Sequence, residues 1–334
     1  MPTISDVAKL AGVSPKTVSR VLNTEPNVTE ATRAVVLEAI RTLDYFPSQS
    51  ARQLRTGQSN IIGLISDEIA TTPFAVDIIK GAQAAAWQFD KLLTVLNTES
   101  DTSVEKRAFQ LAREYRFDVI LFAAFFHREV RLTENVSDIP LVLLDCFEAS
   151  GRFPSVVPNE AQGGFDATRE LLNHGHTRIG FINFDQPIPA TLGRLEGYRR
   201  ALETAGIGFD PQLVAADNGQ ATGGYRSALR LLERDDRPTA IFCWNDRVAM
   251  GAYDAVRRLN LSIPGDVAII GFDNQEIIAS QLHPALTTMQ LPHYEMGQWA
   301  VQYALQAIEE GANGGQLPPV RHKVDCQIVR RASV

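Results

Sequence analysis

The chain has 334 residues, of which 45% are hydrophobic and 21% are charged. This composition is typical of a globular protein of two or three domains, and it excludes a disordered chain, a collagen-like chain and a small disulfide-linked scaffold. The net charge of −7 is unevenly distributed, because residues 1–60 carry +2 and residues 61–334 carry −9. The total charge therefore does not exclude a nucleic-acid partner for the N-terminal segment.

The longest apolar runs are far shorter than the roughly 20 residues of a membrane-spanning helix. The N-terminus lacks the basic and apolar regions of a secretion signal. The three cysteines, Cys146, Cys243 and Cys326, are widely spaced and odd in number, which is typical of reduced thiols. We expect a cytoplasmic protein with no membrane partner.

Residues 3–22 carry the signals of two short helices in succession. Thr3 and Asp6 form a capping-box pattern, apolar residues follow at helical spacing, and Gly12 can end the first helix. Ser14 and Pro15 then favour the start of a second helix. Two short helices joined by a glycine-containing turn indicate a helix-turn-helix motif. A third helix, predicted over 31–44, closes a small core with Val35, Val36, Ala39, Ile40 and Leu43.

The second helix is expected to present a polar outer face made of Lys16, Thr17, Ser19, Arg20 and Asn23. Long cationic and hydroxyl side chains on such a helix can reach base edges and phosphates in the major groove. The alternative is the ordinary solvated face of a helical hairpin. The pattern favours DNA binding over this alternative.

The run from Thr3 to Asn23 resembles the DNA-binding head of the lactose-repressor (LacI/GalR) family, and residues 43–47 and 51–54 resemble that family's exit from helix three and its hinge. The resemblance implies a DNA-binding domain over 1–47 and a hinge over 48–59. It implies a minor-groove wedge at Leu54, for which the alternative is a plain linker with Leu54 packed on a partner chain. The DNA-binding residues that it implies are Thr3, Ser14, Pro15, Lys16, Thr17, Ser19, Arg20, Asn23, Ala51, Leu54 and Arg55.

Beyond the hinge, short apolar runs alternate with amphipathic stretches, which indicates parallel α/β sheets. Strands are predicted over 61–65, 92–96, 119–122, 141–144, 179–182, 240–242, 267–271 and 324–329. Helices are predicted over 76–89, 104–115, 163–172, 194–205, 224–233 and 248–259. Some 275 residues of this pattern predict two lobes.

Polar side chains follow several predicted strands, where open α/β sheets bind their ligands. Asp145, Asn245 and Asp273 come at strand ends, and Arg194 is expected at a helix start. Carboxylates and amides in such a cluster suit adjacent sugar hydroxyls, and aromatic faces are offered by residues such as Phe74 and Trp244. The alternative is that the polar residues cap helices or turns.

The runs 175–179, 245–251, 263–273 and 286–288 resemble core motifs of the same family, in the same order. The resemblance implies a periplasmic-binding-protein-like core over 60–334, with lobe 1 over 60–158 and 291–321 and lobe 2 over 159–290 and 322–334. It implies an effector site made of Phe74, Asp145, Arg194, Asn245 and Asp273, to which the strand-end pattern adds the aromatic face of Trp244. Gly219 stands where some members carry an aromatic residue, and the wall residue is His293 or Tyr294.

We therefore expect an all-α helix-turn-helix head joined to a two-lobed parallel α/β core. The expected function is a homodimeric transcriptional regulator, a repressor, that binds a pseudo-palindromic operator and responds to a sugar or sugar derivative. A nucleobase or another non-sugar metabolite is the alternative effector. Rival classes are a solute-binding protein and an enzyme using Asp145 and Asp273 as acid and base. We expect no enzyme activity and no cofactor. We also expect no metal site, because His174 and His176 have no further metal ligands clustered with them in the sequence.

Overall fold

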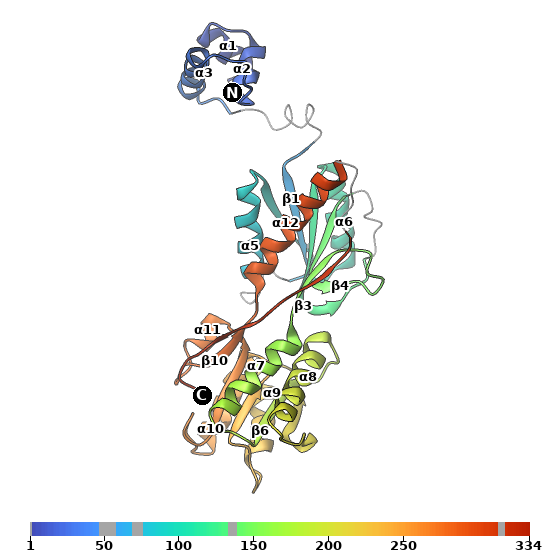
Figure 1. The fold of residues 1–334 in the computed structure, drawn as a ribbon, viewed down its shortest axis with the longest axis vertical. Helices are drawn as coiled ribbons and strands as arrows, with labels where there is room; N and C mark the ends of the chain where they lie inside the picture. The colour runs from blue at the N-terminus through green and yellow to red at the C-terminus, as the bar shows by residue number, and fades with distance from the viewer. Residues whose placement is uncertain (1, 47–57, 69–75, 133–138, 313–317) are drawn as a thin grey trace. The chain divides into compact units, whose positions relative to one another are not determined.

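The computed structural model describes residues 2–46, 58–68, 76–132, 139–312 and 318–334 (Figure 1). The chain divides into two compact units, Met1–Ser59 and Asn60–Val334. Ala51, Leu54, Arg55 and Phe74 lie outside the described residues, so their expected roles stay predictions. None of the described helices is long and apolar enough to cross a membrane.

The first unit is a bundle of three helices, α1 (Ile4–Ala11), α2 (Pro15–Leu22) and α3 (Glu30–Leu43). The expected caps are confirmed. The Thr3 side chain accepts the N–H of Asp6 and the Asp6 carboxylate accepts the N–H of Thr3, while Gly12 ends α1 with φ of 67°. Val35 was expected in the core, but it is 52% exposed because α3 buries the face that carries Val36 and Ala39 instead.

The second unit begins with a parallel sheet in the strand order β11-β5-β4-β3-β1-β2. Its strands are β1 (Ile61–Ser66), β2 (Leu92–Asn97), β3 (Val119–Glu129), β4 (Leu141–Phe147), β5 (Ser155–Pro158) and β11 (Arg321–Val324). Helices α5 (Val76–Gln88) and α12 (His293–Ala312) bury one face of this sheet, and α6 (Thr102–Glu114) buries the other. We call this layered body lobe 1.

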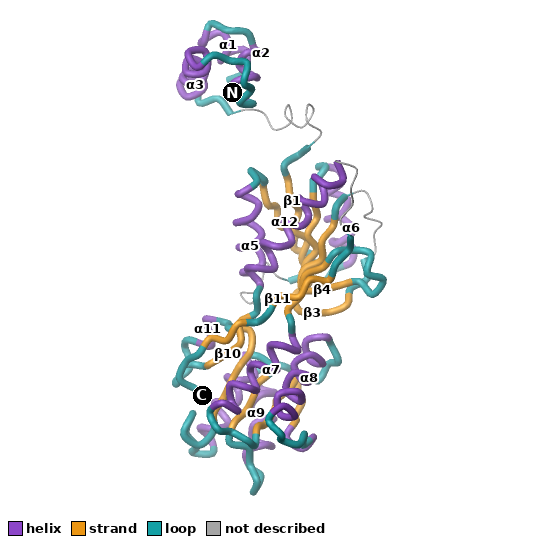
Figure 2. Tube along the Cα trace, viewed as in Figure 1, coloured by secondary structure: helices purple, strands orange, loops and turns teal. Residues whose placement is uncertain are grey.

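A second sheet has the order β12-β10-β9-β8-β6-β7 and forms lobe 2. Its strands are β6 (Ile179–Phe184), β7 (Val214–Asp217), β8 (Ala240–Cys243), β9 (Ala268–Asp273), β10 (Thr287–Gln290) and β12 (Gln327–Val329). Only the β10–β12 pair is antiparallel among the described strand pairs. Figure 2 shows helices on both sides of the strands. They are α7 (Glu160–Asn173), α8 (Pro189–Thr204), α9 (Ala221–Leu232) and α10 (Asp246–Arg258), with the short α11 (Glu276–Ala279) and the 3₁₀ turn η1 (Pro211–Leu213).

The expected fold class is confirmed, with several differences in detail. Helix α12 was not among the predicted helices. The four-residue strands β5, β7 and β10 were not predicted either, because each contains a polar residue or a proline that interrupts its apolar run, whereas the equally short β8 is apolar throughout and was predicted. The expected boundary of lobe 1 at residue 321 is too early. Strand β11 pairs with β5 in the first sheet, so the chain leaves lobe 1 for the last time between Val324 and Gln327. The single strand expected over 324–329 is thus divided between the two sheets.

Glycines let neighbouring helices of each lobe touch through their backbones. A Cβ atom on Gly81 of α5 would overlap the carbonyl of Tyr294 in α12, and one on Gly224 of α9 would overlap that of Val248 in α10. A Cβ atom on Gly164 of α7 would overlap the carbonyl of Arg194 in α8 and lie 2.8 Å from its Cα. The close approach of α7 and α8 thus depends on the missing side chain.

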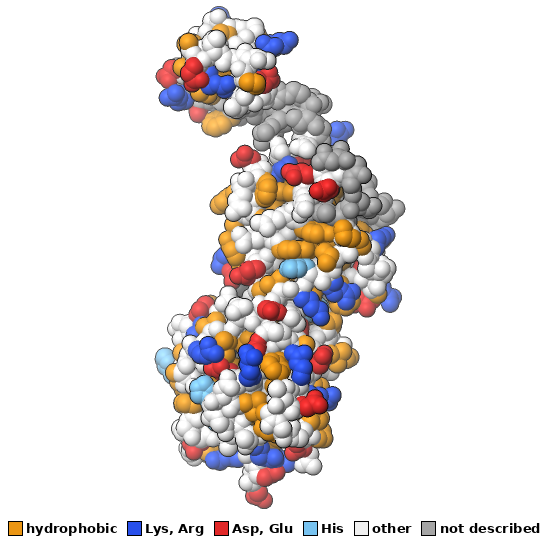
Figure 3. Space-filling model, in the orientation of Figure 1, with side chains coloured by type: hydrophobic (Ala, Val, Ile, Leu, Met, Phe, Trp, Pro, Cys, Tyr) orange, Lys and Arg blue, Asp and Glu red, His pale blue; other side chains and the backbone are white. Residues whose placement is uncertain are grey.

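On the face of the core seen in Figure 3, acidic and basic side chains are interspersed rather than separated by sign. The charge of −9 on residues 61–334 is therefore not gathered into one acidic patch on this face.

Candidate functional site

The first unit places the expected DNA-binding residues at its surface. Those within the described residues are all at least partly exposed: Thr3, Ser14, Pro15, Lys16, Thr17, Ser19, Arg20 and Asn23. Several also have local structural tasks. Ser14 caps α2 by accepting the N–H of Thr17 at 3.2 Å, and Arg20 lies 3.7 Å from Glu25. Lys16 is exposed in the first turn of α2, the part of a recognition helix that contacts bases.

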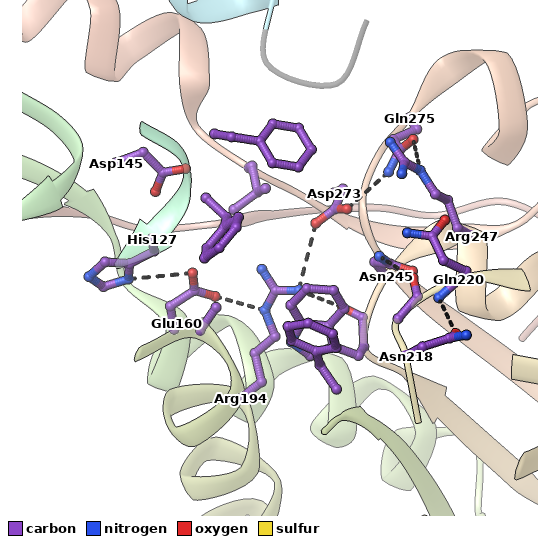
Figure 4. Close-up of a pocket in the computed structure, with 17 residues that line it drawn as sticks. His127, Asp145, Glu160, Arg194, Asn218, Gln220, Asn245, Arg247, Asp273 and Gln275 are labelled. Carbon is purple, nitrogen blue, oxygen red and sulfur yellow. Dashed lines mark hydrogen bonds and ion pairs between the residues drawn. The ribbon is translucent and has the colours of Figure 1, made fainter. Parts of the chain in front are cut away.

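The second unit contains a cavity that opens to solvent (Figure 4). Residues from both lobes line it. Lobe 1 supplies Phe125, Phe126, His127 and Asp145, while the remaining lining residues are Glu160, Phe184, Ala190, Arg194, Asn218, Gly219, Gln220, Trp244, Asn245, Arg247, Asp273, Gln275 and Leu291. Five of the six expected effector residues thus line one cavity, and the sixth, Phe74, is outside the described residues.

Arg194 is the centre of the polar network in this cavity. It was expected at a helix start, but it lies in the second turn of α8 and is only 3% exposed. Its Nε donates to Glu160 Oε2 at 2.8 Å, and its Nη1 donates to the carbonyl of Trp244. The guanidinium also lies 3.7 Å from the centre of the Phe272 ring. Stacking and hydrogen bonds therefore fix its orientation.

Glu160 was not predicted as a site residue, although its carboxylate contacts side chains of both lobes. It is the first residue of α7 and is 4% exposed. One carboxylate oxygen meets Arg194, and the other lies 3.6 Å from His127 Nδ1 on β3 of lobe 1. Burial alone would raise the pKa of Glu160, but the charges of Arg194 and His127 outweigh burial and lower it to about 2. Glu160 is therefore ionised at neutral pH.

Asp273, the last residue of β9, behaves in the opposite way. Burial raises its pKa to about 7, and Arg194, whose guanidinium Nη1 is 3.6 Å away, offsets this only in part. Its neighbour Asp246 does not line the cavity. It accepts hydrogen bonds from Thr288 Oγ1 and the N–H of Gln275, both at 2.6 Å, and burial raises its pKa as well. One end of the cavity thus contains a carboxyl group that titrates near neutrality.

The capping alternative is confirmed for Asn245. Its side chain accepts the N–H of Val248 at 2.8 Å as the cap of α10, and it donates to the carbonyl of Gly219 at 3.2 Å. Asn245 still lines the cavity, but both of its polar atoms are already bonded to backbone. It therefore shapes the wall more than it offers free hydrogen bonds.

Trp244 stacks on Phe184 with ring centres 4.8 Å apart, forming an aromatic wall. This pair explains the glycine at position 219. Gly219 has φ of 68°, and a Cβ atom there would lie 3.0 Å from Phe184 and 3.3 Å from Trp244. The two rings thus crowd the space that a side chain at position 219 would need.

Asp145 supplies an unsatisfied acceptor from lobe 1. It lies within β4 rather than after it, and it is 2% exposed. Its Oδ1 is buried without a hydrogen-bond partner among the described residues, while Oδ2 lies 3.7 Å from His293 Nε2. The indole N–H of Trp244 is also buried, and it too has no hydrogen-bond partner among the described residues. A buried acceptor and a buried donor at one cavity call for a ligand that has both a donor and an acceptor.

Comparison with known proteins gives two matching family models. Residues 3–48 match the bacterial regulatory proteins of the lacI family, and residues 168–334 match a periplasmic binding protein-like domain. The chain is 34% identical over 313 residues to the ribose operon repressor of Escherichia coli, covering 93% of this chain and 94% of that protein. The chain belongs to the lacI family of bacterial regulatory proteins.

Other members of the lacI family match at similar levels. The HTH-type transcriptional repressor PurR of Aliivibrio salmonicida is 33% identical over 312 residues, covering 93% of both chains. The solved structure of the transcriptional regulator CelR in complex with cellobiose is 26% identical, covers both chains fully and superposes with a TM-score of 0.68. The family resemblance inferred from the sequence motifs is confirmed. Members of this family are DNA-binding regulators with an effector-binding core, and they are not enzymes.

The residues that sequence reasoning missed lie mostly beside strands or helix starts that were placed wrongly. The helix containing Glu160 was expected to begin at Gly163, although Pro158 and Asn159 mark an earlier start. Asn218 and Gln220 follow β7, which was not predicted. Among the described residues, no group of three or more His, Cys, Asp or Glu side chains is arranged to hold a metal.

Proposed function

We propose that this lacI-family member is a transcriptional repressor whose homodimer binds a pseudo-palindromic operator through α2 and is controlled by a sugar or sugar derivative in the cavity. The observation that carries the proposal is the cavity between the lobes with its unbonded Asp145 oxygen and Trp244 N–H. A sugar hydroxyl both donates and accepts, so it satisfies either group.

The chemistry of the cavity wall supports a carbohydrate. Carboxylates and a guanidinium at one end bind hydroxyls, and the Trp244–Phe184 pair offers a flat apolar face to a sugar ring. The matching relatives include a ribose operon repressor and a regulator crystallised with cellobiose. The same aromatic pair favours a flat heterocycle such as a nucleobase as the second candidate.

DNA binding is tested with the full-length protein. Duplexes selected from a random pool give the operator, and fluorescence anisotropy then measures affinity. We expect Lys16→Ala and Arg20→Ala to weaken binding by roughly tenfold or more. Arg41→Ala removes an exposed cation from α3 as a matched control. Loss of binding in the Arg41 variant alone would contradict the role of α2.

The hinge prediction is tested in the same assay. Leu54→Ala should weaken operator binding strongly and leave effector affinity unchanged, since a wedge acts only on DNA. Unchanged operator affinity would remove the wedge.

The effector is sought by a thermal-shift screen of sugars and nucleobases, because a specific ligand raises the melting temperature by mass action. Hits are then added to the operator complex to determine whether they release or strengthen it. A repressor returns its effector unchanged, so formation of product from a glycoside would contradict the proposal. A hit without any effect on DNA binding would instead favour the solute-binding class.

A further inference from the structure

The positive charge of Arg194 is already balanced within the protein. Its ion pair with Glu160 joins two side chains that are 3% and 4% exposed. Asp273 adds a second carboxyl group 3.6 Å from Nη1. Nη2 forms no hydrogen bond with any described residue. Arg194 therefore offers a ligand two N–H donors on one nitrogen, but no unbalanced charge.

The surroundings of Arg194 are rich in carboxylates. Asp145, Glu160 and Asp273 all line the same cavity. The facing imidazoles are His127, 3.6 Å from Glu160, and His293, 3.7 Å from Asp145. We refer to Arg194 and these three carboxyl groups as the carboxylate end of the cavity.

The other cationic side chain that lines the cavity is set apart from the carboxylate end. Arg247 bonds Gln275 Oε1 at 3.4 Å and forms no ion pair with a described carboxylate. Figure 4 shows it beside Gln275, away from Arg194. An anion thus meets an unbalanced cation at Arg247 but not at Arg194.

We propose that Glu160 determines effector specificity by restricting the carboxylate end to neutral, hydroxyl-bearing groups and rejecting carboxylates and phosphates there. The inference rests on the proposed sugar-responsive function and extends it to a chemical class. A ligand anion at Arg194 would have to displace Glu160 or lie beside its buried charge, and both arrangements are unfavourable. A hydroxyl can accept from Nη2 of Arg194, and a neighbouring hydroxyl can donate to the unbonded oxygen of Asp145.

The ionisation state of Glu160 supports its role in rejecting anionic ligand groups. Arg194 and His127 hold its pKa at about 2 against the effect of burial. The repelling charge is therefore present at neutral pH.

The test compares neutral sugars with their own acids on the full-length protein by isothermal titration calorimetry. The pairs are D-ribose with D-ribonate, D-glucose with D-gluconate, D-galactose with D-galactonate, and cellobiose with cellobionate. We expect the wild type to bind a neutral member at least tenfold more tightly than its acid. Glu160→Gln should move this ratio toward the acid by roughly tenfold or more, which corresponds to about 1.4 kcal/mol.

Glu170→Gln is the matched control. Glu170 lies on the same helix, is 5% exposed and forms an ion pair with Arg330 at 2.6 Å, yet it does not line the cavity. Its loss should leave the ratio unchanged. Glu160→Asp keeps the charge, so it should keep the wild-type preference even where overall affinity falls. If circular dichroism shows that Glu160→Gln does not fold, Glu160→Asp becomes the test. The inference then requires that Glu160→Asp retain the preference for the neutral sugar.

The outcomes separate the two levels of the proposal. Wild-type protein that binds none of the neutral sugars overturns the sugar assignment and this inference with it. Wild-type protein that binds an acid as tightly as its neutral partner overturns the inference alone. The inference is also overturned if Glu160→Gln leaves the ratio of neutral-sugar to acid affinity unchanged. It is likewise overturned if Glu170→Gln changes this ratio as much as Glu160→Gln does.

Discussion

The Glu160–Arg194 ion pair should contribute measurably to the stability of lobe 2. Replacing Arg194 with Met leaves the Glu160 carboxylate buried without its ion-pair partner, with His127 Nδ1 3.6 Å away as the nearest remaining polar group of the network. The Glu160 pKa falls from 4.5 to about 2, which corresponds to about 3 kcal/mol at about 1.4 kcal/mol for each pKa unit. Removing one partner of a buried ion pair typically costs about 3–5 kcal/mol of unfolding free energy. The estimate from the pKa shift therefore agrees with this typical cost.

The double variant Arg194→Met, Glu160→Gln should be much less destabilised than Arg194→Met, because it removes the buried charge of Glu160 together with that of Arg194. Urea unfolding of all four proteins, followed by circular dichroism, gives the coupling free energy of the pair. We expect about 3 kcal/mol at pH 7. A coupling below about 0.5 kcal/mol, the usual limit of additivity, would refute the reasoning.

The same cycle has a defined pH dependence. The pKa of Glu160 is lower in the folded protein than in the unfolded chain. Its contribution is therefore complete above the unfolded value, near pH 4.5, and is lost as the pH falls toward 2. The stability difference between wild type and Glu160→Gln should shrink over that interval.

Three further predictions concern other parts of the chain. Asp273, whose folded pKa is raised to about 7, keeps a proton that the unfolded chain releases, so stability should fall as the pH rises from about 4 to 7. Asp273→Asn should flatten this fall in melting temperatures measured from pH 5 to 8; an unchanged slope would exclude Asp273 as its source. Gly164→Ala should destabilise the core by about 1–3 kcal/mol through overlap with Arg194, whereas Gly208→Ala, with open space around it, should be nearly neutral in urea unfolding. Ser14→Ala should cost the head about 1 kcal/mol by removing the cap of α2, and an unchanged melting temperature of the head would contradict that role.

Local signals in the sequence predicted the head more completely than the core. The Thr3–Asp6 capping box and the Ser14–Pro15 start each lie within a few residues, so the chemistry that forms them is visible in one short window. The long buried strands were predicted for the same reason. The four-residue strands β5, β7 and β10 were not, because a polar residue or a proline interrupts the apolar run of each, whereas the equally short β8 is apolar throughout and was predicted.

The residues of the cavity could be predicted from the sequence only in part. Arg194, Trp244 and Asp273 were predicted from strand ends and family motifs, and they line the cavity. Glu160 has no comparable signal, because its role arises when α7, α8 and β3 meet in space. Glu160 and His127 are 33 positions apart in the sequence and belong to different lobes. Only the folded chain shows that they share a charge network.

The contact of α7 and α8 at Gly164 has a mechanical consequence. Two main chains in direct contact leave no side-chain rotamer to yield between them, so the pair behaves as one stiff body. Arg194 on one helix and Glu160 on the other then keep a fixed spacing. We expect a displacement of the Arg194 guanidinium to move α7 and α8 together, and α7 begins beside Pro158 and Asn159, where the chain passes from one lobe to the other. Gly164, which does not line the cavity, would then determine how rigidly the cavity is coupled to this crossing.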